Sequence, residues 1–258
     1  GYMSMKPHNV CIVGMGYGGL TLGVTLAEAG FKGIGVETNK AIARRLKKGA
    51  PHFHERGLAR LLAKQLANGL TVSTQMPRNQ DAFILCVSTP VDRATKEPIL
   101  RHVAHAAWEV KNRLENGNLV VVRSTVPMGA TRKLVKPILD RAGKKYFLAF
   151  CPERTAEGNA LSELRELPQI VGGIDDESVD QAIALFRPIT KTIIDVSSVE
   201  AAEMIKLINN AYRDLTFAYA NEVALASEGF GLDPVEVIKA ANLGYHRSNI
   251  PLPGLVGG

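Results

Sequence analysis

The feature that most constrains the fold of this 258-residue chain is a glycine-rich run near its start, Val10-Cys-Ile-Val-Gly14-Met-Gly16-Tyr-Gly-Gly19. Its glycines satisfy the spacing G-x-G-x-x-G between an apolar run and a helical pattern. The first glycine allows a tight turn, the second lets the backbone approach a pyrophosphate, and the third lets the helix pack close to the strand. The run therefore predicts a phosphate-binding helix N-terminus. The expected ligand contacts are Gly14, Gly16, Tyr17, Gly18 and Gly19.

Up to residue 197, apolar strand-like runs alternate with amphipathic helical patterns. Strands are expected at residues 9–13, 33–37, 70–73, 82–87, 119–122, 146–150 and 192–195. Helices are expected at residues 19–29, 39–48, 55–67, 99–114, 130–141 and 177–186. Continuous Val/Ile/Leu strands separated by helices indicate a parallel sheet covered on both faces. The sequence thus predicts an α/β fold with a doubly wound, mostly parallel Rossmann-type sheet.

The pattern changes after residue 197. Val199–Gly229 is expected to form one long helix, with Gly229 and Gly231 as stop signals. Asp233 then caps a second helix over residues 234–241, which begins with a proline. We expect residues 1–197 to form a dinucleotide-binding, Rossmann-like domain and residues 198–258 to form an incomplete helical central segment.

Composition narrows the classes of function. The net charge of +6 comes from scattered Lys and Arg with few aromatic residues between them, which favours a solvated surface over a nucleic-acid interface. The three cysteines lack C-x-x-C spacing, so we expect no disulfide framework and no metal site, and a cytoplasmic location. The sequence contains no run of 18 apolar residues, so no membrane partner is expected.

Glu37 ends the second expected strand. A carboxylate at this point of a Rossmann unit accepts hydrogen bonds from the ribose hydroxyls and repels a 2′-phosphate, which favours NAD over NADP as the cofactor. Lys40, Arg44 and Arg45 follow closely and offer an alternative, a site for a 2′-phosphate. We interpret them instead as a basic helix face.

Polar clusters follow two further strands, in Val87-Ser88-Thr89-Pro90 and Arg123-Ser124-Thr125-Val126-Pro127. In open α/β sheets, ligands bind outside the carboxyl ends of the strands. Ser88, Thr89 and Thr125 are therefore expected to contact the cofactor or a catalytic water. Hydroxyl residues before proline are equally common as ordinary turn residues, and the residues alone leave both interpretations open.

These segments, taken in order, resemble the UDP-glucose/GDP-mannose dehydrogenases, which oxidise the C6 alcohol of a nucleotide sugar to a carboxylate. The further matching segments are Cys151-Pro-Glu153-Arg-Thr-Ala-Glu157-Gly158, Ile170-Val-Gly172-Gly173, Ala202-Glu203-Met-Ile-Lys206-Leu-Ile-Asn-Asn210-Ala-Tyr-Arg213 and Ala220-Asn221-Glu222. The resemblance covers nearly the whole chain. It implies a nucleotide-sugar substrate, a role in polysaccharide biosynthesis, and a homodimer formed through the helix Val199–Gly229.

The resemblance also implies roles for single residues. Thr125 and Glu157 match residues that hold a water near the nicotinamide, and Glu153 matches an acidic residue of the substrate pocket. Lys206 and Asn210 match the pair that polarises the C6 oxygen; their i, i+4 spacing places both on one helix face. Arg247 resembles an arginine that reaches the sugar of the neighbouring subunit. Arg154 in Cys-Pro-Glu-Arg favours a UDP-N-acetylhexosamine.

In the family, the catalytic cysteine lies two residues beyond a Gly-Gly, and Pro253-Gly254-Leu-Val-Gly257-Gly258 matches the residues that lead into it. We therefore expect this sequence to lack the cysteine and the family's C-terminal nucleotide-binding domain, and to bind NAD without turning over a nucleotide sugar. Two alternatives stay open. One is a 6-phosphogluconate or 3-hydroxy-acid type dehydrogenase, which also combines a Rossmann domain with a helical one. The other is a non-catalytic NAD-binding dimer module.

Overall fold

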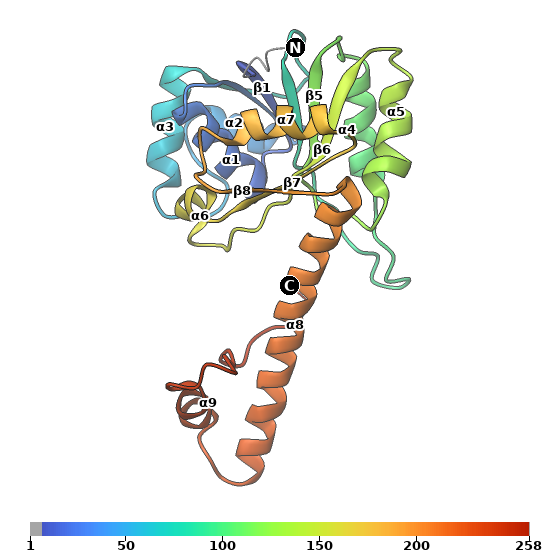
Figure 1. The fold of residues 1–258 in the computed structure, drawn as a ribbon. Coiled ribbons are helices and arrows are strands. Elements are labelled where there is room, and N and C mark those ends of the chain that lie inside the picture. The colour runs from blue at the N-terminus through green and yellow to red at the C-terminus, as the bar shows by residue number, and fades with distance from the viewer. Residues whose placement is uncertain (1–6, 258) are drawn as a thin grey trace. The chain divides into compact units, whose positions relative to one another are not determined.

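The computed structural model describes residues 7–257. Eight strands form one sheet in the order β3-β2-β1-β4-β5-β6-β7-β8 (Figure 1). All neighbouring strands are parallel except β6 and β7, which are antiparallel. The strands are β1 (Asn9–Val13), β2 (Lys32–Val36), β3 (Leu70–Ser73), β4 (Ala82–Leu85), β5 (Asn118–Val122), β6 (Tyr146–Phe150), β7 (Gln169–Gly173) and β8 (Ile193–Val196). The strand order reverses between β1 and β4, and such a reversal opens a ligand-binding crevice.

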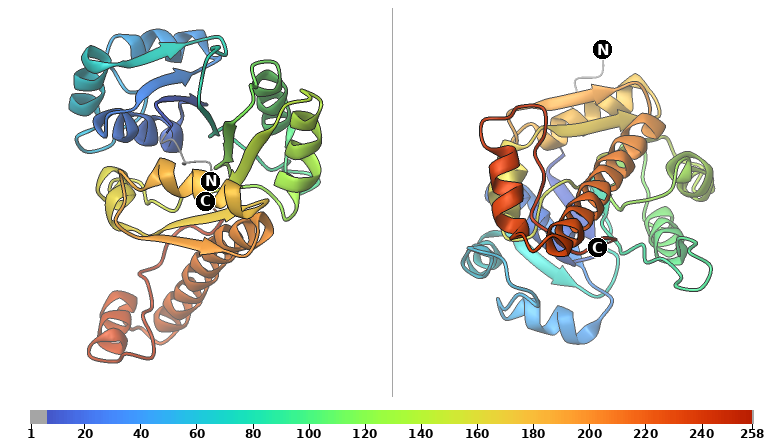
Figure 2. Two further views of the ribbon diagram at one scale, coloured as in Figure 1. Left: turned by 45° about the horizontal axis from the view of Figure 1, so that its top comes forward. Right: turned by 90° about the horizontal axis from the view of Figure 1, so that it is seen from below.

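The helices connect the strands and cover the sheet. They are α1 (Tyr17–Glu28), α2 (Lys40–Lys47), α3 (Leu58–Asn68), α4 (Arg101–Lys111), η1 (Thr131–Val135), α5 (Lys136–Asp140), α6 (Ala160–Glu166) and α7 (Asp176–Phe186). Helix α1 packs against α3 and α6, and α4 packs against α5. Figures 1 and 2 show the group of α1, α3 and α6 beside one half of the sheet and the pair of α4 and α5 beside the other half. The doubly wound, mostly parallel fold predicted from the sequence is confirmed.

The core lies on the central strands. Every residue of β4 and β5 is buried, as are four of the five residues of β1. Because helices cover both faces of these strands, the strands need apolar residues at consecutive positions rather than at alternate ones. Phe83 on β4, Phe150 on β6 and Phe186 on α7 are the largest fully buried side chains. This rigid centre fixes the strand ends that carry the polar residues.

One strand, β7, was not predicted. Gln169–Gly173 contains only two branched apolar residues and ends in two glycines, which sequence patterns do not favour in a strand. The structure explains the first of these glycines. A Cβ on Gly172 would lie 2.7 Å from the Cβ of Ala202, closer than real Cβ atoms come. Glycine is therefore required for β7 to pack against the helix that starts at Val199.

Several helices differ from expectation, among them α4, which covers Arg101–Lys111 rather than residues 99–114. Helix α6 was not predicted, and α3 begins at Leu58 rather than at residue 55, after Gly57 with a φ of 80°. A positive φ ends regular structure at low cost only at glycine. The expected helix 130–141 consists of a π-helical turn followed by the short α5.

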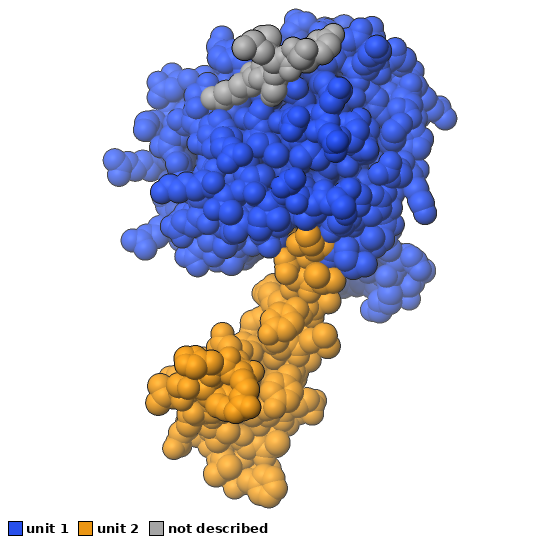
Figure 3. Space-filling view, viewed as in Figure 1, with its two compact units in different colours: residues 1–204 blue, residues 205–258 orange. Residues whose placement is uncertain are grey.

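The chain divides into two compact units, Gly1–Met204 and Ile205–Gly258 (Figure 3). The second unit contains most of α8 (Val199–Gly229) and all of α9 (Pro234–Asn242). The predicted ends of α8 are confirmed, and so is the Asp233 cap, whose side chain accepts a hydrogen bond from the Val235 amide. Asn221 exchanges two hydrogen bonds with Gly254, and Asn242 exchanges two with Ile250. These side-chain amides hold the segment after α9 within its unit.

Candidate functional site

A cavity of about 1030 Å³ opens at the carboxyl ends of β1, β2 and β4. Its walls come from the turn after β1, the ends of β2 and β4, the segment 74–76 after β3, and one face of α4. All of these belong to the first compact unit. The cavity lies at the reversal of strand order, where open α/β sheets bind their ligands. Of the expected cofactor residues, Gly14, Gly16, Tyr17, Glu37 and Ser88 line it.

The glycine-rich turn forms the floor of this cavity. Gly14 has a φ of 96°, and a Cβ there would lie 2.8 Å from the Cys86 carbonyl oxygen. Gly16 is the N-cap of α1, and a Cβ built on it meets nothing within 4 Å, which leaves room for a ligand against the backbone. Gly18 and Gly19 lie outside the cavity. A Cβ on Gly19 would collide with the Gly14 carbonyl oxygen, so this glycine lets helix and turn approach each other.

Glu37 lies half-buried at the end of β2, and its Oε2 accepts a hydrogen bond of 2.8 Å from the Asn39 amide. Asn39 in turn caps α2 through the amides of Ala41 and Ile42. The carboxylate is thus oriented by the local backbone and has a second oxygen to offer a ligand. Lys40, Arg44 and Arg45, the alternative 2′-phosphate site, are absent from the residues that line the cavity.

The two polar clusters after β4 and β5 are joined by hydrogen bonds. The Thr89 hydroxyl donates to the Thr125 carbonyl oxygen at 2.6 Å, and the Ser124 hydroxyl donates to the Val87 carbonyl oxygen at 2.6 Å. Ser88 faces the cavity, whereas Thr89 and Thr125 do not line it. The hydroxyls of Thr89 and Ser124 therefore hold the two strand ends at a set spacing.

A buried arginine organises the segment that follows β6. Arg123 is 3% exposed and donates from one guanidinium nitrogen to the Cys151 carbonyl oxygen at 3.1 Å and to the Gln169 side chain at 2.9 Å. Its other terminal nitrogen lies 3.7 Å from the Glu153 carboxylate. Sequence reasoning assigned no role to Arg123. The one signal was a charged residue at the end of an apolar strand.

Glu153 lies close to the start of α1. A Cβ on Gly18 would be 3.5 Å from Glu153 Oε2, and the Thr155 hydroxyl donates to Glu153 Oε1 at 2.6 Å. Glu157 is exposed, in the loop and turn between β6 and α6. Thr125 is half-buried, and within the described part of the chain no hydrogen bond joins it to Glu157. The structure brings Glu153 to the glycine-rich helix but leaves Glu157 in solvent.

Lys206, Asn210 and Arg247 belong to the second compact unit. Lys206 is half-buried and Asn210 is exposed, both on α8. Arg247 is exposed in the segment after α9, with its guanidinium carbon 5.1 Å from the centre of the Tyr245 ring. Gly258, the last residue of the Pro-Gly…Gly-Gly motif, lies outside the described residues.

Several cavity residues were not found from the sequence. His102, His105, Glu109 and Arg113 come from α4 or lie just beyond it, and His52 comes from the loop before α3. No sequence motif marks these residues, because α4 comes to lie beside the cavity only when the strands on either side of it assemble into the sheet. Burial lowers the pKa of His52, while nearby Glu37 opposes this shift.

The surroundings of the three cysteines disfavour the thiolate form. Cys11 and Cys151 are buried and Cys86 is half-buried. Burial raises the pKa of each thiol to about 12, so all three are protonated at neutral pH. Among the described residues, no group of three or more His, Cys, Asp or Glu side chains could hold a metal ion. Over the same residues, no helix combines the length and apolar character needed to cross a membrane.

Residues 8–190 match the NAD binding domain of the UDP-glucose/GDP-mannose dehydrogenase family, and residues 200–258 match the central domain of that family. The chain is 36% identical over 248 residues to the UDP-N-acetyl-D-mannosamine dehydrogenase of Methanocaldococcus jannaschii, a match that covers 95% of this chain and 57% of that protein. The chain thus spans little more than half the length of this curated relative.

Solved structures agree with these matches. The UDP-D-ManNAc dehydrogenase from Pyrococcus horikoshii superposes with a TM-score of 0.91 at 30% identity, over 97% of this chain and 61% of that one. The UDP-N-acetyl-mannosamine dehydrogenase from Staphylococcus aureus superposes with a TM-score of 0.85 at 30% identity, over 95% and 61%. From the matched residues, the cavity and the shared fold, the chain belongs to the UDP-glucose/GDP-mannose dehydrogenase family, with residues 8–190 as its NAD-binding domain.

Proposed function

We propose that the enzyme to which these residues belong oxidises the C6 alcohol of a UDP-sugar to the uronate with NAD as the oxidant, and that these 258 residues supply its NAD-binding portion. The observation that carries the proposal is the cavity at the glycine-rich turn, together with the acidic segment that packs against the same helix. Bound NAD would accept hydride from the sugar. The residues of this chain bind the cofactor, orient the sugar and position protons.

The residues present fit NAD. The open space at Gly16 and the N-terminus of α1 suit a pyrophosphate, which hydrogen-bonds to backbone amides and is attracted by the helix dipole. Glu37, oriented by the Asn39 amide, suits the adenosine ribose and disfavours a 2′-phosphate. We assign Gly14, Gly16, Tyr17, Glu37 and Ser88 to cofactor binding. We assign an indirect role to three further residues. Gly18 and Gly19 shape the glycine-rich turn, and Thr89 holds the ends of β4 and β5 together.

We propose that Glu153 contacts the sugar as an acidic residue of the substrate pocket. We further propose that Thr125 and Glu157 hold a water for proton transfer. Lys206 and Asn210 present a cation and an amide donor from one face of α8. Such a pair stabilises negative charge on a reacting oxygen. Arg247, exposed in the second unit, is proposed to contact a sugar bound to a neighbouring subunit.

We propose a UDP-N-acetylhexosamine as the substrate. The relatives described above are named for UDP-N-acetyl-D-mannosamine, and this chain carries Arg154 in the segment Cys-Pro-Glu-Arg. Arg154 donates to the Pro168 carbonyl oxygen at 2.6 Å, which helps to hold this segment against the residues before β7. A substrate of this class and the NAD cofactor fit a cytoplasmic enzyme of polysaccharide biosynthesis.

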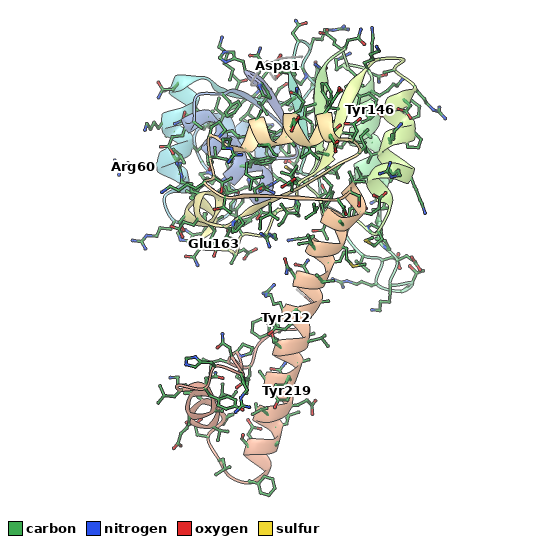
Figure 4. The ribbon with its side chains drawn as sticks, in the orientation of Figure 1. Arg60, Asp81, Tyr146, Glu163, Tyr212 and Tyr219 are labelled. Atoms are coloured by element: carbon green, nitrogen blue, oxygen red, sulfur yellow. The ribbon has the colours of Figure 1, made fainter. Side chains whose placement is uncertain are left out.

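We further propose a homodimer formed through α8. Ile208, Tyr212, Leu215 and Tyr219 are 52%, 71%, 69% and 58% exposed, and their spacing of three and four residues places them on one helix face. Figure 4 labels the two tyrosines on this helix. An exposed apolar stripe of this kind suits burial against the same stripe of a second copy in a twofold interface.

Calorimetry with NAD and NADP tests the cofactor assignment, and the expected result is binding of NAD with much weaker binding of NADP. With NAD present, UDP-N-acetylmannosamine, 6-phosphogluconate and 3-hydroxyisobutyrate are then compared by thermal shift, which reports binding without requiring turnover. A response to the UDP-sugar alone supports the proposal. A response to 6-phosphogluconate or to the hydroxy acid, with none to the UDP-sugar, would contradict it.

A further inference from the structure

Glu55 is a buried carboxylate, 5% exposed, with both oxygens in hydrogen bonds. Its Oε2 accepts from the Tyr17 hydroxyl at 2.8 Å and from the Gly158 amide at 2.8 Å, and its Oε1 accepts from the Ala160 amide at 2.9 Å. These partners lie far away in sequence, on either side of Glu55. A buried carboxylate with three donors is held in one geometry, because any displacement leaves a charged oxygen unpaired.

The three bonds join the two halves of the proposed site. Tyr17 directly follows Gly16 and lines the cofactor cavity. Gly158 ends the segment that carries Glu153 and Glu157, and Ala160 begins α6 just after it. The Tyr17 oxygen also lies 2.9 Å from the Ala156 carbonyl oxygen. The cavity wall and the acidic segment therefore meet at Glu55 and the Tyr17 hydroxyl.

We propose that Glu55 is a positioning residue that couples the Tyr17 wall of the cofactor cavity to the acidic segment 153–158. The inference rests on the proposed function, in which that segment binds the sugar and a water. NAD restrains Tyr17, Tyr17 restrains the Glu55 carboxylate, and the carboxylate restrains the amides of Gly158 and Ala160. Since coupling between two sites is reciprocal, loosening the segment also weakens NAD binding.

The protonation of Tyr17 suits this role. Burial and the hydrogen bond to Glu55 raise the pKa of Tyr17 above its ordinary value. The phenol therefore stays protonated and remains a donor throughout the physiological range. Its ring lies 5.2 Å from that of Phe53, two residues before Glu55. The contact between the two rings therefore helps to hold Tyr17 beside Glu55, in addition to the hydrogen bond.

The test is hydrogen–deuterium exchange of the amides 156–160 in the 258-residue chain, with and without NAD, in E55Q, Y17F and E163Q. Glu163 is the matched control. Its Oε2 accepts from the Ala156 amide at 2.7 Å in the same segment, and among the described residues no hydrogen bond joins its side chain to Tyr17. Amides of β5, buried in the central sheet, serve as the reference for global unfolding.

In the wild type, NAD is expected to slow exchange at Gly158 and Ala160. E55Q replaces one acceptor oxygen by a donor, so exchange at these amides rises about tenfold or more and the response to NAD disappears. Y17F keeps both amide bonds to Glu55, so basal exchange stays near the wild-type rate while the NAD response is lost. E163Q speeds exchange at Ala156 and keeps the NAD response.

A merely structural role for Glu55 predicts that NAD slows exchange by the same factor in every variant, and that result would overturn the proposal. If E55Q also speeds exchange in β5, the substitution has destabilised the whole fold. In that case the NAD response of Y17F alone tests the coupling, because Y17F leaves the Glu55 carboxylate in place. Calorimetry separates the two proposals. Absence of NAD binding to the wild type refutes the proposed function, whereas NAD binding with no change at 156–160 refutes only the coupling.

Discussion

Replacing Gly16 by alanine should weaken NAD binding strongly while leaving the fold intact. Gly16 is the N-cap of α1 with φ −70° and ψ −163°, a conformation that alanine also adopts. The new methyl group meets nothing within 4 Å in the protein itself. It projects where Gly16 lines the cavity, so it competes only with a ligand.

The size of the effect follows from the phosphate contacts. A pyrophosphate at this turn accepts hydrogen bonds from backbone amides at roughly 2.9 Å, a distance that leaves no room for a methyl carbon on the same side. Loss of one charge-assisted hydrogen bond costs about 1.5–3 kcal/mol, which raises the Kd for NAD about 10-fold to 150-fold. The unfolding temperature should change by no more than about 4 °C, because Gly-to-Ala effects at an unstrained position are below about 1 kcal/mol.

Calorimetry measures the Kd and differential scanning calorimetry measures the unfolding temperature. Gly23→Ala is the control in the same helix, since its Cβ would make ordinary contacts of 3.7 Å with Ile12 and Met15. This variant should bind NAD like the wild type. If Gly16→Ala also binds NAD with unchanged affinity, the pyrophosphate does not sit at this turn and the cofactor assignment is wrong.

Four further outcomes are expected. Glu37→Ala should raise the Kd for NAD about tenfold or more and narrow the preference for NAD over NADP, as measured by calorimetry, because the ribose loses its acceptor. Gln169→Leu should lower the free energy of unfolding in urea by about 1–3 kcal/mol, because Arg123 loses a buried partner; an unchanged value would contradict this. Tyr212→Glu should convert the proposed α8 dimer to a monomer in light scattering, whereas replacing an exposed charged residue outside this helix face should leave the dimer intact. Alkylation of the native thiols should stay slow at pH 9 and accelerate toward pH 12, while the urea-unfolded chain reacts readily near its ordinary thiol pKa.

Patterns confined to a few neighbouring residues were enough to predict most of the fold. Runs of branched apolar residues located seven of the eight strands, and the glycine and aspartate signals located α8 and α9. These features succeed because the hydrogen bonds of a helix, and the burial pattern of a strand covered on both faces, depend on residues close in sequence. The strand β7 escaped prediction because the need for glycine at residue 172 comes from the distant start of α8.

The cofactor half of the candidate site was predictable for the same reason. Gly14, Gly16 and Glu37 belong to one βαβ unit, where spacing alone brings the turn and the carboxylate together. The placement of Thr125, Glu153 and Glu157 was not predictable by spacing. Thr125 follows β5 whereas Glu153 and Glu157 follow β6, and only the order of these strands in the sheet sets how far Thr125 lies from the two carboxylates.

The sequence by itself determined the sheet class, the phosphate-binding turn and the residue at the end of β2, since each depends on local conformation and on burial. Only the tertiary structure decided which polar groups meet. Glu55 and Gly158 are 103 residues apart, and Arg123 and Gln169 are 46 apart, yet each pair shares a hydrogen bond in the interior. No local pattern encodes such pairs, because a buried charge is stabilised by whichever donors and acceptors the folded chain brings within about 3 Å of it.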